Sequence, residues 1–179
     1  MVSFSNPNEL GRFVRKIGVE NFKDGGTAHV VPASRIRFET PYVDLSSYSP
    51  MADAFAFVAK DGMLFTQFLD VQGWSNDLVF YSGGSIFFDP GTGISSSTKH
   101  LELYSKGSIA GVGVDIANDN GSVFIYGKEG VLLTDGEIRS GSGGYDYYDG
   151  YGTISNSIIG SIDGGIDGGL DGSEGNSGI

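Results

Sequence analysis

The chain has 179 residues, of which 30 are glycine, contains no cysteine and carries a net charge of −11. This length suffices for one domain with its own core and is too short for two large ones, while the lack of cysteine excludes disulfides, thiolate metal sites and a cysteine nucleophile. The first six residues lack a basic leader followed by an apolar segment, and no apolar run approaches 18 residues. We therefore expect neither a classical export signal nor insertion into a membrane.

Residues 1–27 are expected to form an arm with one short helix. Ser5 or Asn6 can cap this helix, because Pro7 then occupies its first position. Apolar residues follow at helical spacing, and they are Leu10, Phe13, Val14 and Ile17. The pattern allows two interpretations, a helix packed on the rest of the protein or an anchor that attaches it to a larger assembly.

Residues 28–140 are predicted to form an all-β body. The segments His29–Val31 and Arg35–Glu39 lie next to prolines, which favours edge strands. Two antiparallel hairpins are expected to follow, the first turning at residues 60–62 and the second at residues 82–85. These hairpins concentrate the phenylalanines, so they should hold the main core.

Between residues 101 and 140, short apolar and β-branched runs alternate with glycine-containing turns. Strand-forming runs at this spacing are typical of a meandering or coiled all-β body, either a sandwich or a β-helix-like fold. The runs are Leu101–Tyr104, Val112–Ile116, Val123–Tyr126, Val131–Thr134 and Glu137–Arg139.

Residues 141–179 form a glycine-rich tail whose six carboxylates are accompanied by no Lys or Arg. An apolar residue recurs at every fourth position, and in an extended chain an even period places these side chains on one face. One chain cannot bury such a stripe by itself, so an oligomerising tail, with about three chains around a common axis, is predicted; the alternative is a solvated linker. The oligomerisation residues are Ile154, Ile158, Ile162, Ile166 and Leu170.

Catalytic patterns are weak, and no enzyme activity is expected. Neither His29 nor His100 accompanies a serine in a nucleophile-elbow motif. Calcium is the one cofactor considered, because oxygen ligands gather on a predicted turn and in the tail, although their spacing misses an EF-hand loop. Ordinary turns and solubilising carboxylates are the alternative. The candidate cation ligands are Asp115, Asn118, Asp119, Asn120, Asp163, Asp167 and Asp171.

The glycine-punctuated strands, the N-terminal arm, the lack of cysteine and the repetitive glycine-rich end resemble bacteriophage virion fibre and attachment proteins. This resemblance, over residues 82–179, implies an intertwined homotrimer on the virion, attached by its N-terminal part and exposed toward its C-terminal part. Two other classes compete with it, a calcium-stabilised extracellular adhesin and a single-strand nucleic-acid-binding protein that would use Arg35, Arg37 and Phe38. The acidic tail argues against nucleic acid as its own partner.

Overall fold

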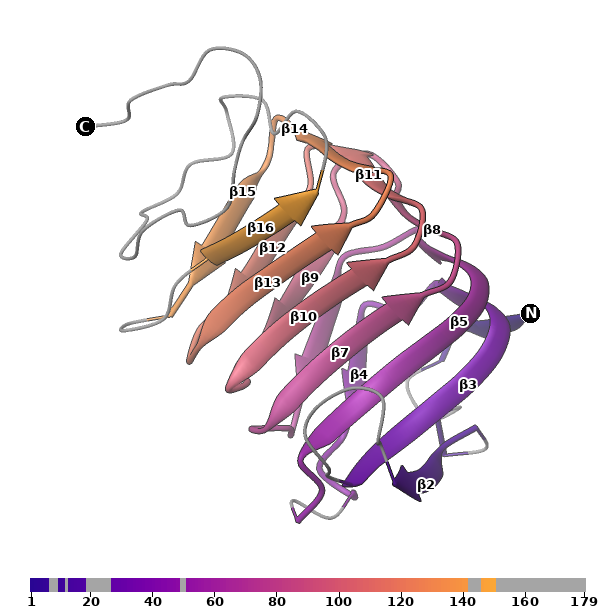
Figure 1. The fold of residues 1–179 in the computed structure, drawn as a ribbon. Helices are drawn as coiled ribbons and strands as arrows, with labels where there is room; N and C mark the ends of the chain where they lie inside the picture. The colour runs from indigo at the N-terminus through magenta and orange to yellow at the C-terminus, as the bar shows by residue number, and fades with distance from the viewer. Residues whose placement is uncertain (7–9, 12, 19–26, 49–50, 142–145, 151–179) are drawn as a thin grey trace.

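The fold is a coil of short, mostly parallel strands in a computed structural model that describes residues 1–6, 10–11, 13–18, 27–48, 51–141 and 146–150. The chain winds through successive turns of a β-solenoid, with its N-terminus at one end of the stack (Figure 1). No α-helix occurs in the described ranges. The strands are β1 (Val2–Phe4), β2 (Arg15–Gly18), β3 (Thr27–Phe38), β4 (Tyr42–Asp44), β5 (Ala54–Phe65), β6 (Leu69–Gln72), β7 (Asp77–Ser82), β8 (Ser85–Phe88), β9 (Gly93–Ser96), β10 (His100–Ser105), β11 (Ser108–Val112), β12 (Asp115–Asn118), β13 (Ser122–Gly127), β14 (Gly130–Thr134), β15 (Glu137–Ser140) and β16 (Asp146–Gly150).

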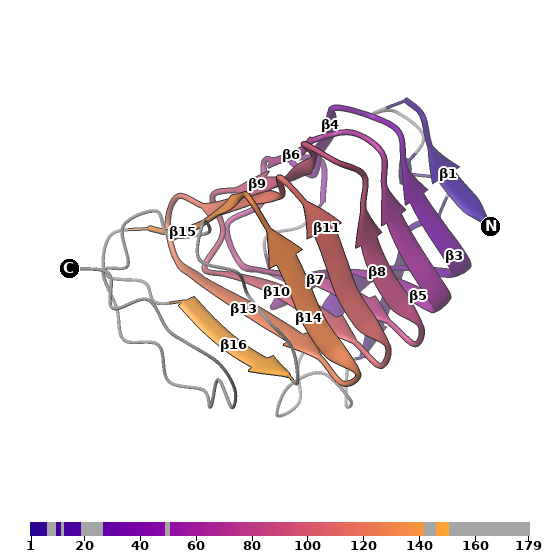
Figure 2. The ribbon, with the colours of Figure 1, turned by 90° about the horizontal axis from the view of Figure 1, so that it is seen from above.

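A complete coil contains three strands, for example β10, β11 and β12, and the next coil consists of β13, β14 and β15. Equivalent strands of successive coils pair in parallel. Leu78 pairs with Leu101, 23 residues later, and Leu101 pairs with Val123, 22 residues later. The view from above shows how the strands of one coil enclose the interior from different sides (Figure 2). The structural repeat is therefore 22 or 23 residues long.

The coils build two sheets. Sheet A has 11 strands and bends after the first strand of each coil, so we divide it into two limbs. Limb A1 contains the first halves of β3 and β5 with β7, β10, β13 and β16, while limb A2 contains the second halves of β3 and β5 with β8, β11 and β14. Sheet B has five strands in the order β15, β12, β9, β6 and β4. Of the two predicted architectures, the structure has the β-helix-like one.

The prediction of antiparallel hairpins was wrong. Residues 60–62 lie inside the continuous strand β5, whose first half pairs with β7 and whose second half pairs with β8, in parallel in both cases. The glycines after β7 bend the chain without reversing it, because they lie against the bend of the preceding coil. A Cβ atom on Gly83 or Gly84 would come 2.3 Å from the carbonyl oxygen of Lys60 or 2.1 Å from that of Asp61. Only glycine lets these two bends stack so closely.

The predicted run Val112–Ile116 also divides at a bend. Val112 ends β11, and β12 begins at Asp115. Gly113 between them has a φ of 65°, in the left-handed region that an extended strand does not use. The remaining strands predicted between residues 101 and 140 are present, but they pair one coil away instead of with their neighbours in sequence.

The predicted N-terminal helix was also wrong. Arg15–Gly18 forms β2, which pairs antiparallel with β3, while β1 pairs in parallel with the second half of β3. The free edge of β3 satisfies the backbone of both segments, whereas a helix would contain the unfavourable Gly11. Phe4 packs against Phe13 and Phe38 at ring-centroid distances of 5.8 and 5.5 Å. The arm therefore covers the first coil, and its use as an anchor stays a prediction.

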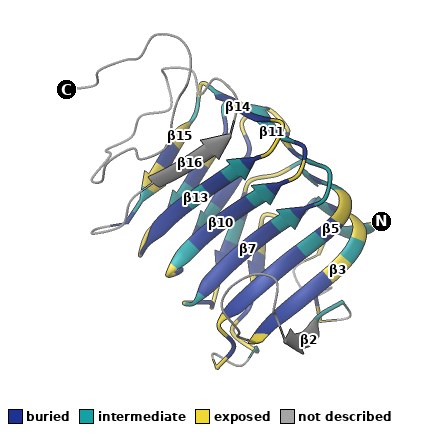
Figure 3. Cartoon of the chain, viewed as in Figure 1, coloured by how far each residue is buried: buried dark blue, intermediate teal, exposed yellow. Residues whose placement is uncertain are grey.

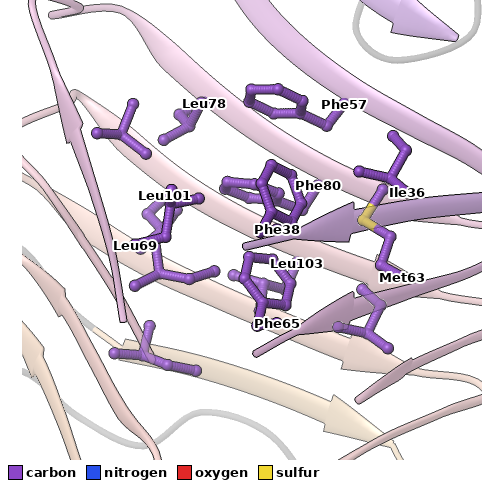
Figure 4. Packing of buried hydrophobic residues seen from close by; sticks show 14 of the residues in the cluster. Ile36, Phe38, Phe57, Met63, Phe65, Leu69, Leu78, Phe80, Leu101 and Leu103 are labelled. Carbon is purple, nitrogen blue, oxygen red and sulfur yellow. The ribbon is translucent and has the colours of Figure 1, made fainter. Parts of the chain in front are cut away.

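Stacked rows of equivalent residues fill the interior (Figure 4). The ring of Phe65 lies between those of Phe38 and Phe88, with both centroid distances 4.6 Å, and Phe57 stacks on Phe80 at 5.1 Å. Aliphatic residues continue these rows in the later coils, where Leu103 and Ile125 follow Phe80. The core is thus widest in aromatic content near the N-terminal end and becomes aliphatic toward β13.

Candidate functional site

Limb A1 carries a row of aromatic side chains on its outer surface. Tyr81, Tyr104 and Tyr126 are in register on β7, β10 and β13, and we call them the aromatic row. The rings of Tyr104 and Tyr126 lie 6.3 Å apart and are tilted by 49°. All three side chains are partly exposed, although much of the surrounding face is buried (Figure 3). Tyrosine combines a large apolar area with a polar hydroxyl, so such a row suits contact with another surface.

Beside the aromatic row lies a cluster of Asp77, His100 and Glu102, which we call the acid–histidine cluster. Asp77 begins β7 and His100 begins β10, directly before the paired residues Leu78 and Leu101. His100 Nδ1 lies 2.8 Å from Asp77 Oδ1. One donor atom from each of the three side chains lies within 4.8 Å of the other two. It is the one such group of three among the residues whose placement is described.

The cluster is held by neighbours on the same face. The indole N–H of Trp74 donates a 3.0 Å hydrogen bond to the backbone oxygen of Asp77. The ring of His100 meets that of Phe124 edge to face, with centroids 5.4 Å apart. Asp77 and Glu102 are only 6% and 3% exposed, whereas the side chain of His100 is 25% exposed. Access from solvent is therefore through the histidine.

A second surface lies on limb A2. Leu64, Phe87, Ala110 and Leu132 are in register on four successive strands and form what we call the apolar stripe. Phe87 is 50% exposed and Leu132 is 53% exposed. At the N-terminal end of the stripe an open hollow of about 390 Å³ is lined by Met1, Arg35, Ile36, Arg37, Asp61, Gly62, Met63, Leu64, Ser85 and Phe87. This surface combines apolar area with cationic groups.

The four candidate cation ligands of the body do not converge on one point. Asn118 is fully buried, where its Oδ1 accepts a 2.9 Å hydrogen bond from the Thr98 N–H and its Nδ2 donates one of 2.9 Å to the Ser122 oxygen. Asp115 and Asp119 are exposed and contact the next coil, through the Glu137 N–H and the Arg139 guanidinium. Asn120 is exposed as well and donates to the Ser97 oxygen. Calcium binding here stays a prediction.

The tail predictions lie outside the described residues. This applies to the oligomerisation residues and to the tail carboxylates, which are Ile154, Ile158, Ile162, Ile166, Leu170, Asp163, Asp167 and Asp171. Of residues 141–179 the structure describes Gly141 and β16, and β16 continues sheet A by pairing with β13. The oligomerising role of the tail stays a prediction.

The aromatic residue of the proposed nucleic-acid groove points into the core. Phe38 is fully buried between Phe4 and Phe65, so its ring face is not accessible to a base. Arg37 forms an ion pair with Glu39 at 2.8 Å. Single-strand binding needs accessible rings beside cations, and these residues do not provide that combination.

The acid–histidine cluster was missed in the sequence because its members are far apart in the chain. Asp77 and His100 are separated by 23 residues, the same separation as the paired Leu78 and Leu101. Recognition of the repeat would have placed them side by side, since equivalent positions of successive coils are neighbours. The search for a serine partner considered His100 only for a different chemistry.

Among the described residues, no helix has the length and apolarity needed to cross a membrane. Comparisons with protein-family models, with curated proteins and with solved structures found no match to this chain.

Proposed function

We propose that this chain is a non-enzymatic structural subunit that associates with copies of itself, as a homotrimeric fibre, spike or decoration protein of a viral particle. The observation that carries the proposal is the exposed apolar stripe on limb A2. Neighbouring strands of a sheet are about 4.8 Å apart, so Leu64, Phe87, Ala110 and Leu132 form a continuous band about 14 Å long. Contiguous exposed apolar surface of this kind marks contact sites for other proteins.

A second copy of the same chain is the partner that fits this surface best. Val112, 51% exposed, widens the stripe on β11. Arg35 and Arg37 lie at its N-terminal end, in a chain whose net charge is −11. The acidic surface of a neighbouring copy would meet these cations, while the apolar residues of the two copies cover each other. The predicted apolar face of the tail adds a further contact between copies.

The absence of catalysis is part of the proposal and rests on access. The carboxylates of Asp77 and Glu102 are the acid pair nearest to each other on limb A1, but both residues are buried. A glycoside substrate would have to place its scissile bond between two such groups. Their burial favours a structural role for the cluster, and the aromatic row beside it favours surface contact.

The location on a virion rests on the repetitive strand pattern and the acidic glycine-rich end. A fibre or spike requires a stiff body that extends by repetition, and a β-solenoid provides this because each coil contacts mainly its neighbours. The N-terminal arm would face the particle and the C-terminal part would face outward.

The native mass of the protein tests the proposal. We expect a trimer at micromolar concentration, and we expect the double variant Phe87→Ser/Leu132→Ser to lower the mass while the chain stays folded. Phe68→Ser is the matched control, because Phe68 is 39% exposed between β5 and β6 and lies outside the stripe. Ile162→Asp/Ile166→Asp tests the tail separately. A wild-type chain that sediments as a folded monomer would overturn the proposal.

A further inference from the structure

We propose that the acid–histidine cluster binds one divalent transition-metal ion of the zinc type. The ligands are a carboxylate oxygen of Asp77, Nδ1 of His100 and a carboxylate oxygen of Glu102, and water from the exposed side of His100 completes the coordination. This site is independent of the proposed self-association and of the candidate calcium ligands, none of which belongs to it.

The geometry of the three side chains supports the site. Ligands of a tetrahedral zinc ion lie about 3.3 Å apart, because each bond is about 2.0 Å long. Asp77 Oδ1 and His100 Nδ1 are 2.8 Å apart, and all three donor atoms lie within 4.8 Å. Side-chain movements of about 1 Å therefore bring them to bonding distance.

The orientation of the imidazole provides a second, independent indication. His100 Nδ1 is buried and makes no hydrogen bond of acceptable geometry, although Asp77 Oδ1 is only 2.8 Å away. The two atoms thus lie side by side instead of in line along an N–H bond. Side-by-side donors at this distance are what a common metal ion requires, whereas a histidine–carboxylate hydrogen bond requires alignment.

The charge of the cluster also favours a cation. Two carboxylates and a neutral imidazole sum to −2, and two of the three residues are at most 6% exposed. Burial of ionised carboxylates is costly unless positive charge or hydrogen bonds compensate it. A bound divalent ion brings the sum of the three side chains and the ion to zero.

The mixed donor set selects the metal. Calcium and magnesium prefer sites made of oxygen ligands alone, whereas an imidazole nitrogen with carboxylate oxygens suits zinc and its first-row neighbours. Phe124, packed against the edge-to-face ring of His100, fixes the ring plane, and Trp74 fixes the backbone of Asp77. Such supporting contacts hold the ligands in place before the metal arrives.

The ion would join two coils of the solenoid. Asp77 belongs to β7, while His100 and Glu102 belong to β10, one coil later. A metal bound only by the folded chain raises its stability in proportion to the logarithm of metal concentration above the dissociation constant. The site is therefore expected to act on stability and not on a substrate.

Zinc titration of the full-length chain, after treatment with a chelator, tests the proposal. The chain has two histidines, so an imidazole-selective nitrogen NMR spectrum contains signals from only His29 and His100. We expect one zinc ion per chain by calorimetry and a large shift of the His100 Nδ1 signal. His29 is the internal control, because it is buried against Tyr48, Phe55 and Trp74 in the core.

The variants His100→Gln, Asp77→Asn and Glu102→Gln should each weaken zinc affinity at least tenfold. Asp119→Asn is the matched control, because it removes an exposed carboxylate that contacts only Arg139 among the printed ion pairs of the body, and it should leave zinc affinity unchanged. Melting of the metal-free variants shows whether they remain folded. Zinc that binds without shifting His100, or no binding at 100 µM, about the weakest affinity expected of a built site, would overturn the proposal.

Discussion

Asn118 Oδ1 accepts a hydrogen bond from the backbone N–H of Thr98, 20 residues earlier and one coil away, at 2.9 Å. The same amide donates through Nδ2 to the Ser122 oxygen, also at 2.9 Å. One buried side chain therefore connects the bend after β9 with the bend after β12. Since both backbone groups depend on this amide, Asn118 should matter far more to stability than its sequence position in a polar turn indicates.

Asn118→Ala should lower the free energy of unfolding by about 3 kcal/mol, because buried backbone groups lose their partner. Asn120→Ala is the control, since Asn120 is exposed and makes one 3.3 Å hydrogen bond to Ser97. It should cost about 0.5 kcal/mol or less. Denaturant unfolding of both variants measures the difference, and equal effects would contradict the structural role assigned to Asn118.

Phe87 and Phe88 are neighbours in β8 that face opposite sides of limb A2. Phe88 is 5% exposed and stacks on Phe65, whereas Phe87 is 50% exposed. Phe88→Ala should cost about 3–5 kcal/mol of stability through loss of the buried ring. Phe87→Ala should cost less than about 1 kcal/mol in the isolated chain, and unfolding is measured at a concentration where copies do not associate. A reversal of this order would mean that β8 is out of register.

Gly91, Gly113 and Asp135 occupy equivalent bends with φ values of 72°, 65° and 57°. A Cβ atom on Gly91 would meet no other atom within 4 Å, so Gly91→Ala isolates the cost of a left-handed backbone. We expect a loss of about 1 kcal/mol in thermal or denaturant unfolding. Asp135→Asn serves as the control, because Asn tolerates this conformation, and it should be nearly neutral.

Burial raises the pKa of the Tyr48 hydroxyl above its ordinary value of 10.0. The folded state thus favours the neutral form, and this contribution to stability is fully present below pH 10 and is lost as the pH rises through the raised pKa. Tyr48→Phe should remove the latest-titrating component of the tyrosinate absorbance and flatten the fall of stability above pH 10. Titration of Tyr48 together with the free tyrosine range would contradict the assignment.

Strand positions were predictable for physical reasons that operate within a few residues. In β10 and β13, Leu101, Leu103, Val123 and Ile125 alternate with residues of the outer face, and this alternation is local. The all-β class and most strands between residues 101 and 140 follow from it. The N-terminal arm failed the same test, because Arg15–Gly18 has no strong local preference and its partner, β3, lies outside any local window.

Parallel pairing was not predictable from the turns. Gly83 and Gly84 have the composition of a hairpin turn, and what makes them a bend is the backbone of Lys60 and Asp61 beneath them. That contact appears in the sequence only as a 22- or 23-residue repeat, visible in rows such as Ile94, Ile116 and Ile138. The same repeat carries Asp77 to His100, so the cluster and the topology were missed for one reason.

The in-register stacking of coils makes the length of this protein a variable that changes in whole steps. Inserting or deleting a segment of 22 residues with the pattern of β10 to β12 would lengthen or shorten the body by one strand spacing, about 4.8 Å, and leave every other row intact. An insertion of any other length would shift inward residues to the surface from that point onward. Evolution can thus adjust the reach of such a molecule by duplication of a single coil, without the invention of a new core.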